Sequence, residues 1–162
     1  MIPQNTTSVA ILLFVACLPL PLLASMKRAP EPRQISIDPA TTAYLKPSQI
    51  HWQHDPIGAD TAILQGDPSK PGMYIVLVKW APHHMSRPHW HPNDRFITVL
   101  SGTWWVGTGA NFDPERTIPM PAGSFVTDFA KHVHYDGAKD EEVMLQIVGE
   151  GPATATPAEQ KP

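Results

Sequence analysis

The feature that most constrains the fold is a series of short apolar and β-branched runs, each closed by a turn signal. Such residue types favour extended strands, and the runs cover residues 62–64, 73–80, 95–100, 103–106, 124–127 and 143–148. Segments rich in Gly, Pro and Asp separate them at 66–72, 101–102, 107–116, 121–123 and 136–142. The chain has 19 prolines, more than twice the usual share of about 5%, which disfavours long helices.

One helical turn is indicated, at residues 113–116, where Asp113 can act as N-cap and Pro114 takes the first helical position. No helices alternate with the strand-like runs. This order predicts an all-β fold, an antiparallel sandwich or barrel, and argues against a parallel α/β sheet.

The 162 residues are the size of one domain. We expect a signal peptide or N-terminal anchor at residues 1–25, an N-terminal extension at 26–59, the main domain at 60–151 and a mobile C-terminal tail at 152–162. The tail has few apolar residues to bury, which is the basis for expecting it to be mobile.

The apolar run at residues 9–24 predicts a secretory leader, and with it a periplasmic or secreted protein. The run is shorter than the ~20 residues of a spanning helix and contains Pro19 and Pro21. Lys27 and Arg28 follow it, so an uncleaved anchor is one alternative, and cytoplasmic translation from Met26 is another.

Cysteine content and charge exclude two classes of partner. The only cysteine lies inside the leader, so the mature chain has no disulfide partner and no thiol nucleophile. The net charge is −3 and no lysine or arginine cluster is present, which argues against a nucleic-acid partner.

Three histidines have the pattern of a metal site. His89 and His91 are two residues apart, so in a strand they share a face, and His134 follows about forty residues later. Imidazole is the commonest protein ligand of transition metals. We expect one divalent transition-metal ion as cofactor; zinc, iron, nickel, manganese and copper all remain open.

Two motifs carry a resemblance to a known family. HWHPNDRFITVLSG (89–102) and PAGSFVTDFAKHVHYDG (121–137) resemble the first and second motifs of the cupin superfamily, and the similarity extends over roughly residues 60–150 to small bacterial single-domain cupins. It implies a double-stranded β-helix, a jelly-roll-type barrel, with a metal held inside by His89, His91 and His134. It also allows for a homodimer.

Arg95 departs from this resemblance, because most cupins have a glutamate ligand at that place. An arginine stays protonated and does not ligate a metal. Asp94 can take the place of the glutamate ligand only if its loop turns the side chain inward. Arg95 either pairs with a carboxylate (Asp94, Asp128 or Asp136) or faces inward and binds an anionic substrate.

His132 has the same strand parity as His134, so it is the alternative third ligand or an acid–base residue. We prefer His134 because the segment after it resembles the one that follows the ligand in related cupins. Tyr135 is the other candidate catalytic residue. Trp104 and Gln146 are expected to contact a small-molecule ligand, although core packing and mutual hydrogen bonding are the plainer interpretations.

Two functions follow from these features. The first is a metal-dependent enzyme acting on a small substrate, as a dioxygenase or as an isomerase or lyase, because three histidines leave open positions on the ion. The second is an exported cupin that binds a metal or small ligand without catalysis. The fold alone does not decide between them.

Overall fold

The computed structural model describes residues 36–158. The expected leader lies outside the described residues, so it stays a prediction. The chain divides into a unit that ends at Thr41 and a unit that begins at Thr42, and the second unit contains every strand described below. Among residues 36–158, no helix is long and apolar enough to cross a membrane.

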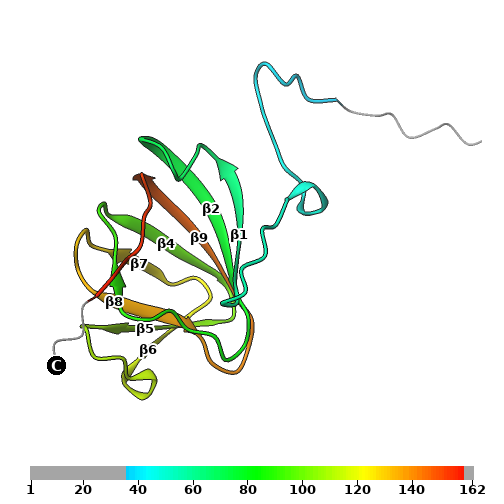
Figure 1. Cartoon of the computed structure of the whole chain (residues 1–162). Helices are drawn as coiled ribbons and strands as arrows, with labels where there is room; N and C mark the ends of the chain where they lie inside the picture. The colour runs from blue at the N-terminus through cyan, green and yellow to red at the C-terminus, as the bar shows by residue number, and fades with distance from the viewer. Residues whose placement is uncertain (1–35, 159–162) are drawn as a thin grey trace, which may run out of the picture. The chain divides into compact units, whose positions relative to one another are not determined.

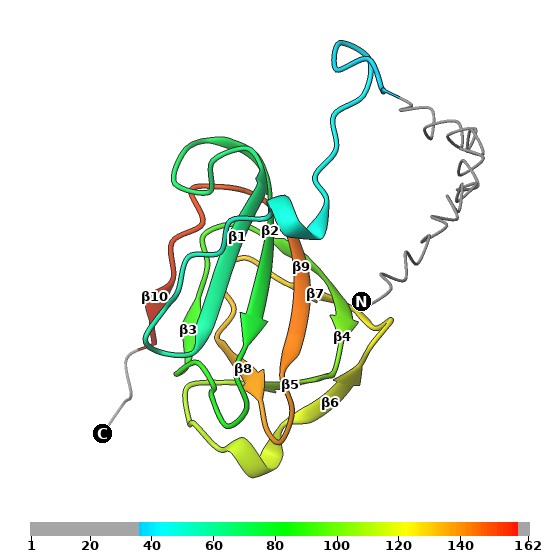
Figure 2. The same ribbon diagram turned by 90° about the vertical axis from the view of Figure 1, so that its right-hand side faces the viewer.

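The second unit is built from two five-stranded sheets (Figures 1 and 2). The first sheet has the strand order β1 (Ala59–Gln65), β2 (Gly72–Trp80), β9 (Val143–Gly151), β4 (Arg95–Ser101), β7 (Phe125–Asp128). The second has the order β10 (Thr156–Pro157), β3 (His89–Trp90), β8 (His134–Ala138), β5 (Thr103–Thr108), β6 (Ile118–Pro121). All paired strands are antiparallel, which confirms the all-β double-stranded β-helix.

The two sheets enclose an apolar core. Alternate residues of a strand face the same side, and in β9 this places the buried side chains of Val143, Leu145 and Ile147 between the sheets. Ile97 of β4 and Trp104 of β5 face them and are almost fully buried. The core is thus built from alternate residues of the predicted strands.

Two short 3-10 helices lie outside the sheets, η1 (Pro47–Gln49) and η2 (Pro114–Arg116). η2 is the helical turn that the sequence predicts. The Asp113 side chain accepts a hydrogen bond from the backbone N–H of Glu115 at 3.1 Å, so the predicted N-cap is confirmed.

The structure differs from the expected pattern around residue 136. Residues 136–142 were expected to form a turn, yet β8 continues through Ala138 and all five of its residues are buried. A burial pattern without alternation, together with an Asp and a Gly in the run, hides this strand from a search for period-two patterns.

The C-terminal segment also differs from expectation. Residues 152–158 lie against the barrel: the Ala153 N–H donates to the Pro68 carbonyl at 2.7 Å, and β10 pairs with β3. The structure therefore differs from the prediction of a mobile tail, because residues 152–158 are held against the barrel. Backbone hydrogen bonds, which composition does not report, hold this polar segment in place.

Strand pairing brings distant polar residues face to face. His89 of β3 lies directly opposite His134 of β8, and Arg95 of β4 lies directly opposite Asp128 of β7. The first pair belongs to one sheet and the second to the other. A polar cluster is therefore assembled between the sheets from both of them.

Candidate metal centre

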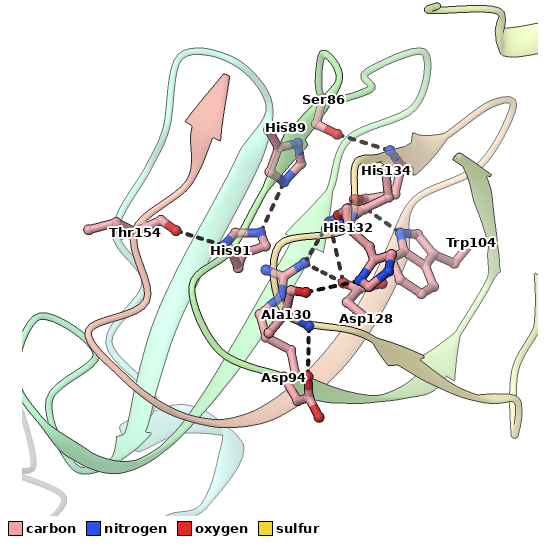
Figure 3. A network of polar contacts seen from close by, with 12 residues as sticks. Ser86, His89, His91, Asp94, Trp104, Asp128, Ala130, His132, His134 and Thr154 are labelled. Atoms are coloured by element: carbon pink, nitrogen blue, oxygen red, sulfur yellow. Dashed lines mark hydrogen bonds and ion pairs between the residues drawn. The ribbon is translucent and has the colours of Figure 1, made fainter. Parts of the chain in front are cut away.

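Three imidazoles converge inside the barrel. One ring nitrogen from each of His89, His91 and His134 lies within 4.8 Å of the others, and the Nε2 atoms of His89 and His91 are 3.0 Å apart (Figure 3). His91 and His134 are buried, each 5% exposed. The pairing of β3 with β8 and the two-residue spacing of the HxH motif explain why the rings meet.

A backbone carbonyl fixes each ring. The Nδ1 atom of each imidazole lies 2.8 to 3.1 Å from a carbonyl oxygen, which belongs to Arg87, Thr154 and His132 for His89, His91 and His134 respectively. A carbonyl oxygen only accepts, so each Nδ1 carries the hydrogen and donates it. In the neutral ring the Nε2 lone pair is then free, as in metal-ligating histidines whose other nitrogen donates to the protein.

The rings of His89 and His91 are held in the neutral form that ligates metals. Burial, followed by the positive charge of Arg95 and the neighbouring histidines, lowers the pKa of His91 to about 3. Burial also lowers the pKa of His89. At neutral pH, protons therefore do not compete with a cation for these two nitrogens.

Arg95 pairs with a carboxylate, which is the first alternative that the sequence left open, and it also faces the histidines; binding of an anionic substrate stays a prediction. Its Nη2 lies 2.5 Å from Asp128 Oδ2 and 3.2 Å from His134 Nε2. Since a guanidinium only donates, the His134 lone pair accepts from Arg95. Asp94 takes no part: its exposed carboxylate accepts the backbone N–H of Ala130 at 2.7 Å.

Asp128 and Asp136 complete the polar cluster. Both carboxylates are buried, and they approach His134 Nε2 to 3.5 and 3.9 Å. Asp136 accepts a hydrogen bond from the Trp104 indole N–H at 3.2 Å, and its backbone N–H donates to the Ser86 hydroxyl at 2.9 Å. The sequence suggested these aspartates only as ion-pair partners of Arg95. Asp136 is two residues from His134, and residues two apart in a strand share a face. Recognition of β8 as a strand would therefore have predicted that Asp136 faces the barrel interior.

Three of the residues expected at the site do not reach it. The Tyr135 hydroxyl donates to the Asp113 carbonyl at 3.0 Å, on the other face of β8 from His134. Gln146 alternates with Leu145 and Ile147, which line the interior, so it faces outward. His132 is exposed and its Nδ1 donates to the Ala130 carbonyl at 2.9 Å.

The geometry of the 129–132 turn explains the position of His132. The His132 N–H donates to the Phe129 carbonyl, and Lys131 has a positive φ of 65°. The chain therefore bends before β8 begins at His134, and the strand parity that would bring His132 inward is broken. Its carbonyl orients His134, whereas its imidazole lies outside the barrel.

A cavity of about 590 Å³ adjoins the cluster, a volume typical of small-molecule sites. Trp104 lies in its wall, as expected for a ligand-contacting residue, and is also part of the core. Its polar lining consists of Asp55, Thr61, Ser86, Arg87, His89, Arg95 and Asp136. The remaining walls are mainly apolar and include Val78, Trp80, Leu145, Ile147 and Ala153.

The donor set fits a transition-metal ion. Imidazole nitrogens suit zinc, copper, iron and nickel. Two ligands at about 2.1 Å from one ion are about 3.0 Å apart at a right angle and about 3.4 Å apart at the tetrahedral angle, close to the 3.0 Å between the first two Nε2 atoms. In neutral rings these lone pairs face each other and repel, and a cation between them would remove that repulsion. His134 would have to exchange its hydrogen bond with Arg95 for the ion.

Comparisons with known proteins agree with this architecture. The family profile described as the ChrR cupin-like domain matches residues 40–154. No curated protein matches the chain. Polyketide cyclase RemF from Streptomyces resistomycificus is 15% identical, with 74% of this chain and 87% of that chain covered and a TM-score of 0.60.

Two further solved structures are similar. An RmlC-like cupin from Shewanella frigidimarina NCIMB 400 is 13% identical, with 74% and 94% covered and a TM-score of 0.54. An uncharacterized conserved protein with a double-stranded β-helix domain from Klebsiella pneumoniae subsp. pneumoniae MGH 78578 is 18% identical, with 67% and 90% covered and a TM-score of 0.53. At these identities the likeness shows the fold. Because the family match spans most of the chain, the protein belongs to the ChrR cupin-like domain family of the cupin superfamily.

Proposed function

We propose that the protein binds one divalent transition-metal ion through His89, His91 and His134, and that it is an enzyme acting on a small molecule held in the barrel cavity. The observation that carries the proposal is the convergence of three ring nitrogens whose partner nitrogens are all committed to backbone carbonyls. Such an arrangement supports ligation more strongly than a set of solvated histidines.

A bound ion would supply Lewis-acid polarisation of a substrate oxygen and open coordination positions. Asp136 is the residue that we assign to proton transfer. Its Oδ1 is held by Trp104 at 3.2 Å, whereas its Oδ2 is 3.9 Å from His134 Nε2, and the residue lines the cavity. A buried carboxylate beside a metal centre suits proton abstraction, which favours an isomerase or lyase over an oxygenase.

Binding without catalysis is the second candidate. One observation favours it: His132 and Tyr135, the two acid–base residues expected from the sequence, hydrogen-bond outside the barrel interior. In that case the cavity would hold a ligand whose binding is sensed by another part of the protein or by a partner. Asp136→Asn separates the two candidates, because it should lower turnover by about 10²- to 10⁴-fold for an enzyme.

Metal content of protein purified without a histidine tag tests the site. We expect about one ion per chain in the unaltered protein and in His132→Ala, and loss of the ion in His134→Ala. The two variants remove the same side chain two residues apart, so they are a matched pair. Retention of the ion by His134→Ala, with circular dichroism showing a folded protein, would contradict the assignment.

Catalysis is tested by screening small molecules for oxygen uptake and for exchange of substrate hydrogen with D₂O. We expect hydrogen exchange that requires the metal and is lost in Asp136→Asn. Oxygen uptake unaffected by Asp136→Asn would favour the oxygenase instead. Ligand binding with neither reaction would favour the binding protein.

A further inference from the structure

The cavity beside the histidines combines charged groups with a mainly hydrocarbon surface. The charged residues in its lining are Asp55, Arg87, Arg95 and Asp136. A second cavity of about 250 Å³ shares Thr61, Val78, Arg95, Ile147 and Ala153 with it. Arg95 therefore borders both spaces, whereas Arg87 lines only the larger one.

Arg95 has an unused donor. Its Nε is buried and has no hydrogen-bond partner among the described residues, whereas its Nη2 serves both Asp128 and His134. A buried donor without a partner is costly. Nε itself is shielded from the cavity, but the Arg95 side chain keeps 14% of its surface exposed and lines the cavity. A ligand acceptor can therefore approach the guanidinium there, and carboxylate oxygens match its planar donors best.

The buried charges indicate how much negative charge the ligand carries. In formal charges, with the imidazoles counted as neutral, Arg95 contributes +1 and Asp128 and Asp136 contribute −1 each. Arg87 and Asp55, which also line the cavity, cancel each other, so the sum is −1. A divalent ion at the proposed site changes the sum to +1. Uncompensated charge in a low-dielectric interior is unfavourable, and one further negative charge from a ligand brings the sum to zero.

We propose that the cavity binds a small monocarboxylate with an apolar body, whose carboxylate lies against Arg95 and whose hydrocarbon part lies against Trp80, Leu145 and Ile147. This inference rests on the proposed metal site, because the charge count includes the ion. The exposed lining of the cavity is mainly apolar, which disfavours sugars. A dianion such as phosphate or succinate overcompensates the charge.

Calorimetric titration of the zinc-loaded protein tests the proposal. The probes are phenylacetate and hexanoate, the amides phenylacetamide and hexanamide as neutral matches, and succinate and phosphate as dianions. We expect at least one monocarboxylate to bind at least tenfold more tightly than its amide and than either dianion. The metal-free protein, with its interior sum of −1, should show no such preference.

Substitutions at Arg95 and Asp128 test whether the ligand needs the guanidinium itself or only the summed charge of the interior. Arg95→Met should lower monocarboxylate affinity at least tenfold. The double variant Arg95→Met/Asp128→Asn keeps the summed charge at +1 with the ion bound and leaves no unpaired carboxylate at position 128. It should also bind at least tenfold more weakly than the unaltered protein. Arg116→Met, which removes an exposed arginine of η2, should leave the affinity unchanged.

Zinc content measured on the same samples distinguishes the two ways to fail. A folded protein that takes up no zinc would refute the metal site and the charge count together. One that holds about one zinc per chain but binds acids and amides equally, or is unaffected by Arg95→Met, would refute the monocarboxylate proposal and leave the metal site standing.

Discussion

Replacing Arg95 with methionine is expected to strengthen zinc binding, although it removes a buried polar residue next to the site. Arg95 Nη2 lies 3.2 Å from His134 Nε2, so its hydrogen occupies the lone pair that would bind the ion. Zinc must displace this hydrogen bond before His134 can ligate. Methionine is also unbranched, is shorter and cannot donate a hydrogen bond, so the lone pair becomes free.

The hydrogen bond sets the size of the effect. A hydrogen bond involving a charged group contributes about 1.5–3 kcal/mol, and each 1.4 kcal/mol changes a dissociation constant about tenfold. We therefore expect zinc to bind about 10- to 150-fold more tightly to Arg95→Met. Loss of the guanidinium also removes repulsion between two cations and leaves Asp128 negative beside the ion, and both effects act in the same direction.

Competition with a fluorescent zinc chelator at pH 7 measures the dissociation constant directly. Arg116→Met is the control and should match the unaltered protein. If Arg95→Met is folded and binds zinc equally or more weakly, Arg95 does not oppose ligation by His134, and the cluster geometry described here does not govern metal uptake.

Three further outcomes are expected. Ile97→Ala, at a fully buried core position, should lower the free energy of unfolding by about 2–5 kcal/mol in urea titrations, with zinc stoichiometry unchanged. Trp104→Phe removes the indole N–H that donates to Asp136 and should cost about 1–3 kcal/mol; equal loss in an Asp136→Asn background would contradict that reason. The melting temperature of the metal-free protein should fall from pH 7 to pH 5, and less so in His91→Gln.

The sign of the pH effect follows from His91. Burial and nearby positive charge lower its folded-state pKa to about 3, whereas an unfolded-chain histidine has a pKa of about 6.5. Between these values the unfolded state binds a proton that the folded state does not. Stability is therefore highest above pH 6.5 and decreases toward pH 3. The same slope in His91→Gln would exclude His91 as its source.

The fold was predictable because most of its strands have a clear sequence pattern. The run at 73–80 became β2, and the run at 143–148 lies within β9; both consist of β-branched and aliphatic residues next to clear turns. β8 was missed because it is buried on both faces and contains Asp136 and Gly137. β10 was missed because it is only two residues long, Thr156–Pro157, and is positioned by pairing with β3, which side-chain composition does not report.

The candidate site was partly predictable for a similar reason. The two-residue spacing and the motif order were enough to bring His89, His91 and His134 together. The spacing could not show that the chain bends at residues 129–132, which turns His132 outward. Nor could it show that Arg95 lies opposite Asp128 across two strands, because that pairing depends on register.

A crystal structure of the zinc-soaked protein, with data collected on both sides of the zinc absorption edge, tests the central claim most directly. We expect one anomalous peak per chain, about 2.1 Å from the Nε2 atoms of His89, His91 and His134, with Arg95 withdrawn toward Asp128. A fully formed barrel with no peak at these nitrogens, or with the peak at His132, would contradict it.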